Sequence, residues 1–172
     1  MIRMPQGWAV CTLISLLATT ALAASPDRTT RRARLVASAD SVKCTIRSIH
    51  GLPGPGGIDK RLHSLRKQLA RPPFSSFKTL KLLQAVELEV PPQGTQETKL
   101  PTGKILKLSF KEKLLVRKDQ IRLRMHLSIT PPNSKRFLPG TLFTIANGGT
   151  LLVAGDKYNG GTHVVGVTCQ SK

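Results

Sequence analysis

A glycine-rich stretch near the end of the chain has the spacing of a phosphate-binding loop. Gly155 and Gly160 have the required separation, and Thr162 stands at the hydroxyl position of such a loop. Gly161, however, occupies the position of the lysine that reaches the β and γ phosphates. The β-branched sequence HVVGVTC follows where the loop requires a helix. We therefore expect no nucleotide to bind here.

Two Asn-Gly pairs in the same region indicate turns instead. Asn147-Gly148 and Asn159-Gly160 each separate two apolar runs, and both residue types tolerate positive φ. The pairs therefore predict successive turns of a β meander.

Other residues capable of chemistry are scattered. Glu87 and Glu89 share one face of a predicted strand, which is the solvent face. A glycosidase needs two carboxylates that flank a cleft, and nothing in the sequence points to such a pair. The sequence contains none of the common metal, calcium or serine-hydrolase motifs, and the histidines fall on separate predicted elements. We therefore expect no catalytic residue, cofactor or metal site. The alternative is a small secreted hydrolase whose Ser-His-Asp site is assembled in space. The four histidines that could contribute to it are His50, His63, His126 and His163.

Basic residues recur at strand period. Arg122, Arg124 and His126 alternate with apolar residues, and Lys107 and Lys81 lie on outward faces of other predicted strands. On neighbouring strands these side chains would form a positive patch that binds polyanions. The alternative is the ordinary solvated face of a half-buried sheet.

The start of the chain predicts export. Arg3 precedes an apolar run from Trp8 to about Leu22, and the small-residue pattern Ala21-Leu22-Ala23 offers a cleavage site. Residues 1–23 are therefore a predicted signal peptide, with an uncleaved membrane anchor as the alternative. The polar, arginine-rich residues 24–40 predict a disordered basic arm, and 41–172 a single domain. We expect a secreted, periplasmic or cell-surface protein.

The net charge indicates which classes of partner such a protein would bind. The chain has 27 Lys and Arg against 9 Asp and Glu, and loss of Arg3 with the signal leaves a net charge of +17. This surplus favours anionic polysaccharide, lipopolysaccharide or an anionic membrane surface, with an envelope protein as a further possible partner. Aromatic residues make up only 4% of the chain, which argues against stacking on single-stranded nucleic acid.

Cysteine content agrees with an exported domain. Cleavage removes Cys11 and leaves Cys44 and Cys169, one near each end of the folded region. Two such cysteines predict one disulfide. Two unrelated buried thiols are the alternative.

Apolar periodicity predicts the elements that position these residues. Val42, Cys44 and Ile46 alternate in a first strand, and Asp59 can cap a short amphipathic helix reaching about Ala70. Short alternating runs separated by turn residues follow. We expect a mainly β fold, an antiparallel sandwich or partly closed barrel of about seven or eight strands with that one helix.

The sequence also carries a resemblance. The signal peptide, PPFSSFK leading into a strand, LPTGKILKLSF, and the ending NGGTLLVAGDKYNGGT together resemble small uncharacterised secreted β-rich proteins of Gram-negative bacteria. The resemblance implies compartment and architecture, and no activity. We therefore expect a non-catalytic binding or structural domain of the cell envelope, or an accessory component of an envelope assembly.

Overall fold

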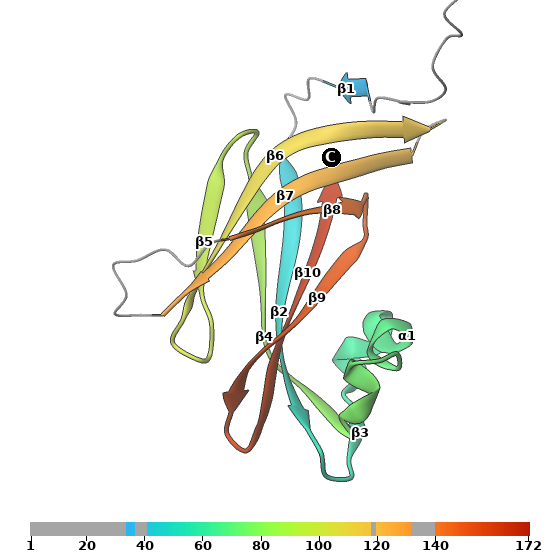
Figure 1. Ribbon diagram of the computed structural model, residues 1–172, viewed down its shortest axis with the longest axis vertical. Coiled ribbons are helices and arrows are strands. Elements are labelled where there is room, and N and C mark those ends of the chain that lie inside the picture. The colour runs from blue at the N-terminus through green and yellow to red at the C-terminus, as the bar shows by residue number, and fades with distance from the viewer. Residues whose placement is uncertain (1–33, 37–40, 118–119, 132–139) are drawn as a thin grey trace, which may run out of the picture. The chain divides into compact units, whose positions relative to one another are not determined.

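The alternating segments form two sheets (Figure 1). The computed structural model describes residues 34–36, 41–117, 120–131 and 140–172. Sheet A has the strand order β1-β6-β7-β8, with β5 also paired to β6, and sheet B the order β3-β4-β2-β10-β9. Sheet A comprises β1 (Arg34–Val36), β5 (Thr95–Lys99), β6 (Ile105–Arg117), β7 (Gln120–Thr130) and β8 (Thr141–Ala146). Sheet B comprises β2 (Val42–Leu52), β3 (Gly57–Ile58), β4 (Thr79–Val90), β9 (Thr150–Tyr158) and β10 (Gly161–Ser171).

The first long strand and the last lie side by side at the centre of sheet B. Strand β2 pairs antiparallel with β10 without interruption, from Val42 opposite Ser171 to Gly51 opposite Thr162. This register places Cys44 directly opposite Cys169. Strands β4 and β9 extend the sheet on either side.

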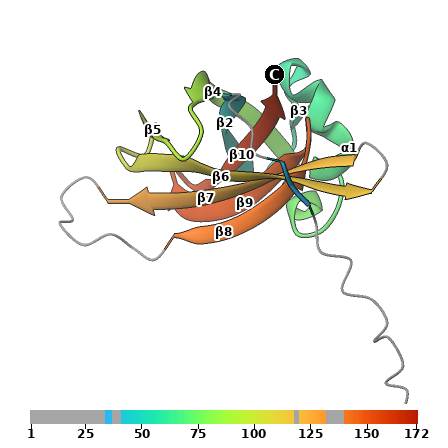
Figure 2. The ribbon, with the colours of Figure 1, turned by 90° about the horizontal axis from the view of Figure 1, so that it is seen from above.

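The two sheets enclose the main core. In Figures 1 and 2 the strands of sheet A run across those of sheet B. Buried Ile46 and Val167 of sheet B belong to the same apolar cluster as Leu108, Leu123 and Met125 of sheet A. The predicted fold class, a mainly β sandwich or partly closed barrel, is confirmed. Eight strands in the described residues have five or more residues, and β1 and β3 are shorter additions.

A helical segment covers the other face of sheet B. Asp59 caps it as predicted, since its Oδ1 accepts a hydrogen bond from the Arg61 backbone N–H at 2.9 Å. Leu62 and Leu65, three residues apart, are both buried, as the three-residue turn of a 3-10 helix allows. The predicted short helix is therefore present, with 3-10 turns first and an α-helical last turn. The helical elements are η1 (Lys60–Leu65), α1 (Arg66–Leu69) and η2 (Phe74–Ser76).

The two Asn-Gly turns have different roles. Asn159 and Gly160 have φ of 41° and 75° and close the hairpin between β9 and β10, as predicted. Asn147-Gly148 instead connects β8 of sheet A to β9 of sheet B. The Asn147 N–H donates to the Ile121 carbonyl at 2.9 Å, and the Gly148 N–H donates to the Cys169 carbonyl at 2.8 Å. The prediction of a meander turn was wrong at this position, because the turn joins the two sheets.

The predicted N-terminal segments are described only in part. Within the segment 24–40, where the sequence predicts a disordered arm, Arg34–Val36 form β1, which pairs with Lys113–Leu115 of β6. The remainder of that segment and the predicted signal peptide, with Cys11, lie outside the described residues. The described residues from Arg34 onward belong to one compact unit. No helix in the described part of the chain is long and apolar enough to cross a membrane.

Candidate functional site

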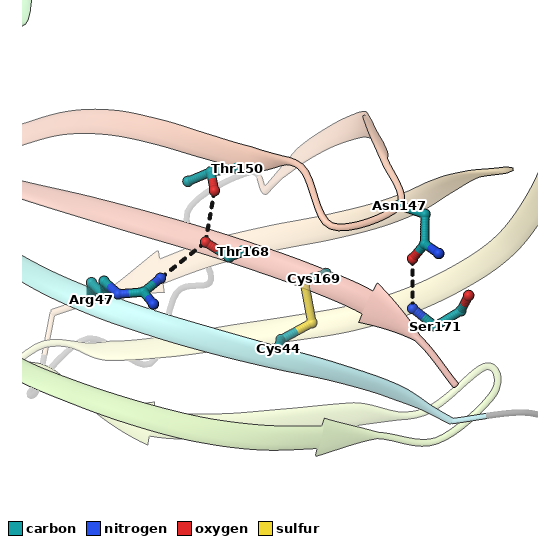
Figure 3. Close-up of a disulfide and its surroundings, with 7 residues drawn as sticks. All are labelled: Cys44, Arg47, Asn147, Thr150, Thr168, Cys169 and Ser171. Atoms are coloured by element: carbon teal, nitrogen blue, oxygen red, sulfur yellow. Dashed lines mark hydrogen bonds between the residues drawn. A yellow bond between two sulfur atoms is a disulfide. The ribbon is translucent and has the colours of Figure 1, made fainter. Parts of the chain in front are cut away.

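The predicted disulfide is present. Cys44 and Cys169 are bonded, and both side chains are buried (Figure 3). Beside them, Thr168 Oγ1 accepts a hydrogen bond from Arg47 Nη1 at 3.1 Å and lies 2.7 Å from Thr150 Oγ1. The disulfide and these bonds link β2, β10 and β9 near the ends of the chain, so this region has a structural role.

Four of the five predicted polyanion-binding residues lie on one surface. Because Leu108, Leu123 and Met125 point into the core, the residues that alternate with them point away from it. Among the described residues, the ionisable side chains that the strand register places on this outer face of sheet A include Glu97, Lys99, Lys107, Glu112, Arg122, Arg124 and His126. Lys81 lies elsewhere, on β4 of sheet B opposite His50, so the patch does not include it.

Carboxylates neutralise part of this outer face. Lys107 Nζ lies 2.5 Å from Glu97 Oε1, and Arg124 Nη1 donates to Glu112 Oε1 at 2.6 Å. Each pair joins residues directly opposite each other on neighbouring strands, where cross-strand side chains meet. His126 is half-buried, and a Cβ on Gly140 would lie 2.3 Å from its ring. The face therefore carries mixed charge.

A second cationic surface lies on the helical segment. We call residues 58–78 the cationic segment, because they contain six Lys or Arg and one carboxylate, Asp59. Its leucines Leu62, Leu65 and Leu69 are buried against sheet B, which leaves the basic side chains exposed. The exposed cations are Lys60, Arg61, Arg66, Lys67, Arg71 and Lys78.

The only carboxylate of the cationic segment is occupied. Arg61 Nη2 lies 2.8 Å from Asp59 Oδ2. The hydrogen bond from the Arg61 side chain, together with one from its backbone N–H, holds the pKa of the Asp59 carboxyl well below its usual range. Within the described residues, the five other cations of the segment form no ion pair with a carboxylate. This surface therefore offers more unneutralised charge than the outer face of sheet A.

The structure also brings together two histidines that the sequence places on separate elements. His50 and His163 lie directly opposite each other on β2 and β10. His50 is 9% exposed, and its Nε2 donates to the Tyr158 carbonyl at 2.8 Å. His163 is 2% exposed, and among the described residues its Nε2 finds no hydrogen-bond partner. The Tyr158 ring lies edge-on to His50, with 5.4 Å between centroids, and 6.1 Å from the His163 ring.

Burial affects the pKa of His163. Desolvation lowers the pKa of His163, and the nearby charges of His50 and Lys104 act in the same direction while Asp156 opposes them. Lys104 Nζ lies 2.6 Å from Asp156 Oδ2, which connects the start of β6 to β9. Imidazole, ammonium and carboxylate groups are those that acid–base catalysis uses. Both rings are buried between β2, β10 and Tyr158 in this structure.

One sequence signal could have found the histidine pair. His50 lies six residues after Cys44, and His163 lies six residues before Cys169. If the two cysteines are opposite each other on paired antiparallel strands, the two histidines must be opposite as well. The predicted disulfide therefore implies that His50 lies opposite His163, provided that the two cysteines are on neighbouring antiparallel strands.

Comparisons with known proteins add no relative. No protein-family model, no curated protein and no solved structure matches the chain. The described residues contain no group of three or more His, Cys, Asp or Glu side chains that could hold a metal ion.

Proposed function

We propose that this chain is an exported, non-catalytic binding domain of the cell envelope, and that it binds anionic polymers through the cationic segment. The observation that carries the proposal is the exposed row of cations on residues 58–78, which has a single carboxylate partner. The chain's surplus of positive charge supports a polyanionic ligand. The predicted signal peptide and the disulfide support a ligand of the envelope rather than an intracellular one.

The cationic segment is suited to a long, flexible polyanion. Its helical part is anchored to sheet B by the buried side chains of Leu62, Leu65 and Leu69. The backbone that carries the helical cations is therefore held in place. A polymer bound there would release condensed counterions at each contact. The outer face of sheet A is the second candidate surface, but carboxylates already pair with Lys107 and Arg124.

Two matched triple variants test which surface binds. One is Lys60→Gln, Arg66→Gln and Lys67→Gln in the cationic segment. The other is Lys107→Gln, Arg122→Gln and Arg124→Gln on sheet A, which makes the same change in charge. Heparin binding across a salt series gives the log–log slope, to which each contact contributes roughly one unit on a duplex-like polyanion. Co-sedimentation with lipopolysaccharide checks the result on an envelope polyanion.

We expect the segment variant to lower the slope by about three if all three cations make contact. The sheet variant should leave the slope nearly unchanged. The reverse result would assign binding to the outer face of sheet A. Absence of salt-dependent binding by the wild-type protein would overturn the proposed function.

A further inference from the structure

A hollow of about 630 Å³ lies at the end of sheet B, beside the β9–β10 turn. A second hollow of about 370 Å³ adjoins it, since Pro53 and Gly160 line both. Volumes of this order are typical of sites that bind small molecules. The side chains of the first hollow that matter here are Phe77, Lys157, Asn159, Thr162 and Ser76.

Glycines leave room for an aromatic ring at this point. A Cβ added to Gly51 would lie 2.8 to 3.0 Å from three atoms of the Phe77 ring. The ring therefore packs directly over the bare backbone of β2. On the neighbouring strand, a Cβ on Gly161 would lie 2.3 Å from the Gly51 carbonyl oxygen and 2.7 Å from His50 Nε2. Phe77 is half-buried and lines the hollow, so part of its ring is available to a ligand.

Polar side chains line the hollow together with the Phe77 ring. Thr162 and Ser76 contribute hydroxyl groups and Asn159 contributes an amide. Tyr158 also lines the hollow, next to the turn. Its backbone carbonyl accepts a hydrogen bond from His50 Nε2, which holds this part of the lining in place. An aromatic face surrounded by hydroxyl, amide and backbone groups matches a sugar ring, which has an apolar face and hydroxyls at its edge.

Charge around the two hollows is of one sign. Lys157 lines the larger hollow and Lys81 the smaller, and no carboxylate lines either one. Neither lysine forms an ion pair with a carboxylate in the described residues. Lys78, the last cation of the cationic segment, directly follows Phe77 in the sequence. Phe77 itself belongs to the cationic segment, so the hollow adjoins the C-terminal end of that segment.

We propose that the larger hollow binds one residue of an acidic polysaccharide. The apolar face of the sugar rests on Phe77, and its carboxylate or phosphate group meets Lys157. The next residue of the polymer occupies the smaller hollow, with its acidic group at Lys81. This proposal rests on the proposed function, because it names the class of polymer and adds a site that recognises its sugar rings as well as its charge.

The experiment compares three probes by isothermal titration. Oligogalacturonate carries both sugar ring and charge, its methyl ester carries the ring alone, and polyphosphate carries charge alone. The variants are Lys157→Gln and Phe77→Leu, which keeps apolar volume in the adjoining core, and the control is Lys111→Gln, an exposed lysine of β6. We expect Lys157→Gln to weaken oligogalacturonate binding about tenfold. Phe77→Leu should weaken it about threefold. Phe77→Leu should not affect polyphosphate, which has no sugar ring, and the control should affect none of the three probes.

Several outcomes would overturn the proposal that the hollow binds an acidic sugar. If both variants bind oligogalacturonate as the wild-type protein does, the hollow takes no part. If binding to phosphatidylglycerol vesicles depends on Lys157 while oligogalacturonate binding does not, the site accepts a lipid headgroup instead. In both cases the cationic-segment triple variant would still weaken polyanion binding, and the proposed function would stand. If the wild-type protein binds none of these probes or heparin, both proposals fail together.

Discussion

The outer face of sheet A and the cationic segment are both rich in basic residues, but they differ in where their carboxylates lie. On sheet A, Glu97 and Glu112 lie directly opposite Lys107 and Arg124 on the neighbouring strands. In the cationic segment, Asp59 pairs with the adjacent Arg61, and no carboxylate follows it up to residue 78. The number of basic residues alone therefore does not identify a polyanion-binding surface.

The difference follows from the geometry of the two elements. A sheet aligns each side chain with one on the next strand, so a distant stretch of sequence can supply a counter-ion. Charges on a short helical segment instead meet neighbours three or four residues away in the same stretch. A binding surface made of unpaired cations is accordingly easier to recognise in a helical segment than on a sheet.

The largest expected effect comes from the buried leucines under the two surfaces. Leu62 supports the cationic segment and Leu123 supports sheet A, and each is fully buried. Replacement of either by alanine should cost about 2–5 kcal/mol of unfolding free energy, measured by urea denaturation, because each leaves a cavity. Under native conditions, only Leu62→Ala should also weaken heparin binding. If Leu123→Ala weakens it equally, the two surfaces do not act separately.

Removing the carboxylates of sheet A should make the two surfaces more alike. Glu97→Gln with Glu112→Gln removes the counter-ions of Lys107 and Arg124. We expect the heparin salt slope to rise by up to about two as these cations become available. Glu87→Gln on β4 is the control for net charge, because in the described residues this carboxylate forms no ion pair. An equal rise in both variants would mean that net charge, not a local surface, controls binding.

The converse change should weaken the cationic segment. Ser64 and Gln68 are exposed, and each lies three residues before a cation, Lys67 and Arg71 respectively. Ser64→Glu with Gln68→Glu therefore places a carboxylate beside each. Exposed pairs of this kind are weak, so we expect the salt slope to fall by only about one. Ser64→Gln is the uncharged control. A comparable fall of the salt slope in this variant would show that the added carboxylates are not the cause.

The sequence predicted features that depend on local pattern. Alternation of Leu123 and Met125 with Arg122 and Arg124 correctly predicted which side chains of β7 face the core. The disulfide was predicted because exported chains with two cysteines usually join them. The outward position of the sheet A cations followed from the same alternation, since side chains of a strand point to opposite faces in turn.

Features that depend on partners distant in the sequence were missed. Asn147-Gly148 forms a turn, but turn chemistry does not say whether the next strand stays in the same sheet. The ion pairs of Lys107 and Arg124 depend on strand register, which alternation leaves undetermined by multiples of two residues. The pairing of His50 with His163 required the register that the disulfide supplies. The hollow at Phe77 depends on the absence of side chains from two neighbouring strands, at Gly51 and Gly161.

The smallest expected effect concerns pH, and it tests whether acid weakens binding by changing the surfaces or by loosening the fold. Burial lowers the pKa of His163 below its ordinary value of 6.5. As the pH falls through about 6.5, the unfolded chain binds a proton at this histidine that the folded chain does not bind. The free energy of unfolding therefore falls. The loss is at most about 1.4 kcal/mol per pH unit for one proton. Urea denaturation at pH 7.5 and 5.5 measures it.

Two variants isolate this histidine. His163→Leu removes the titrating group from an apolar site, so its unfolding free energy should change less between the two pH values than that of the wild-type protein. The comparison variant is His63→Gln, which removes an exposed histidine of the cationic segment. If acid weakens heparin binding in the wild-type protein but not in His163→Leu, the fold around β2 and β10 controls the effect. If both proteins lose binding equally, the buried histidine pair has no influence on the binding surfaces.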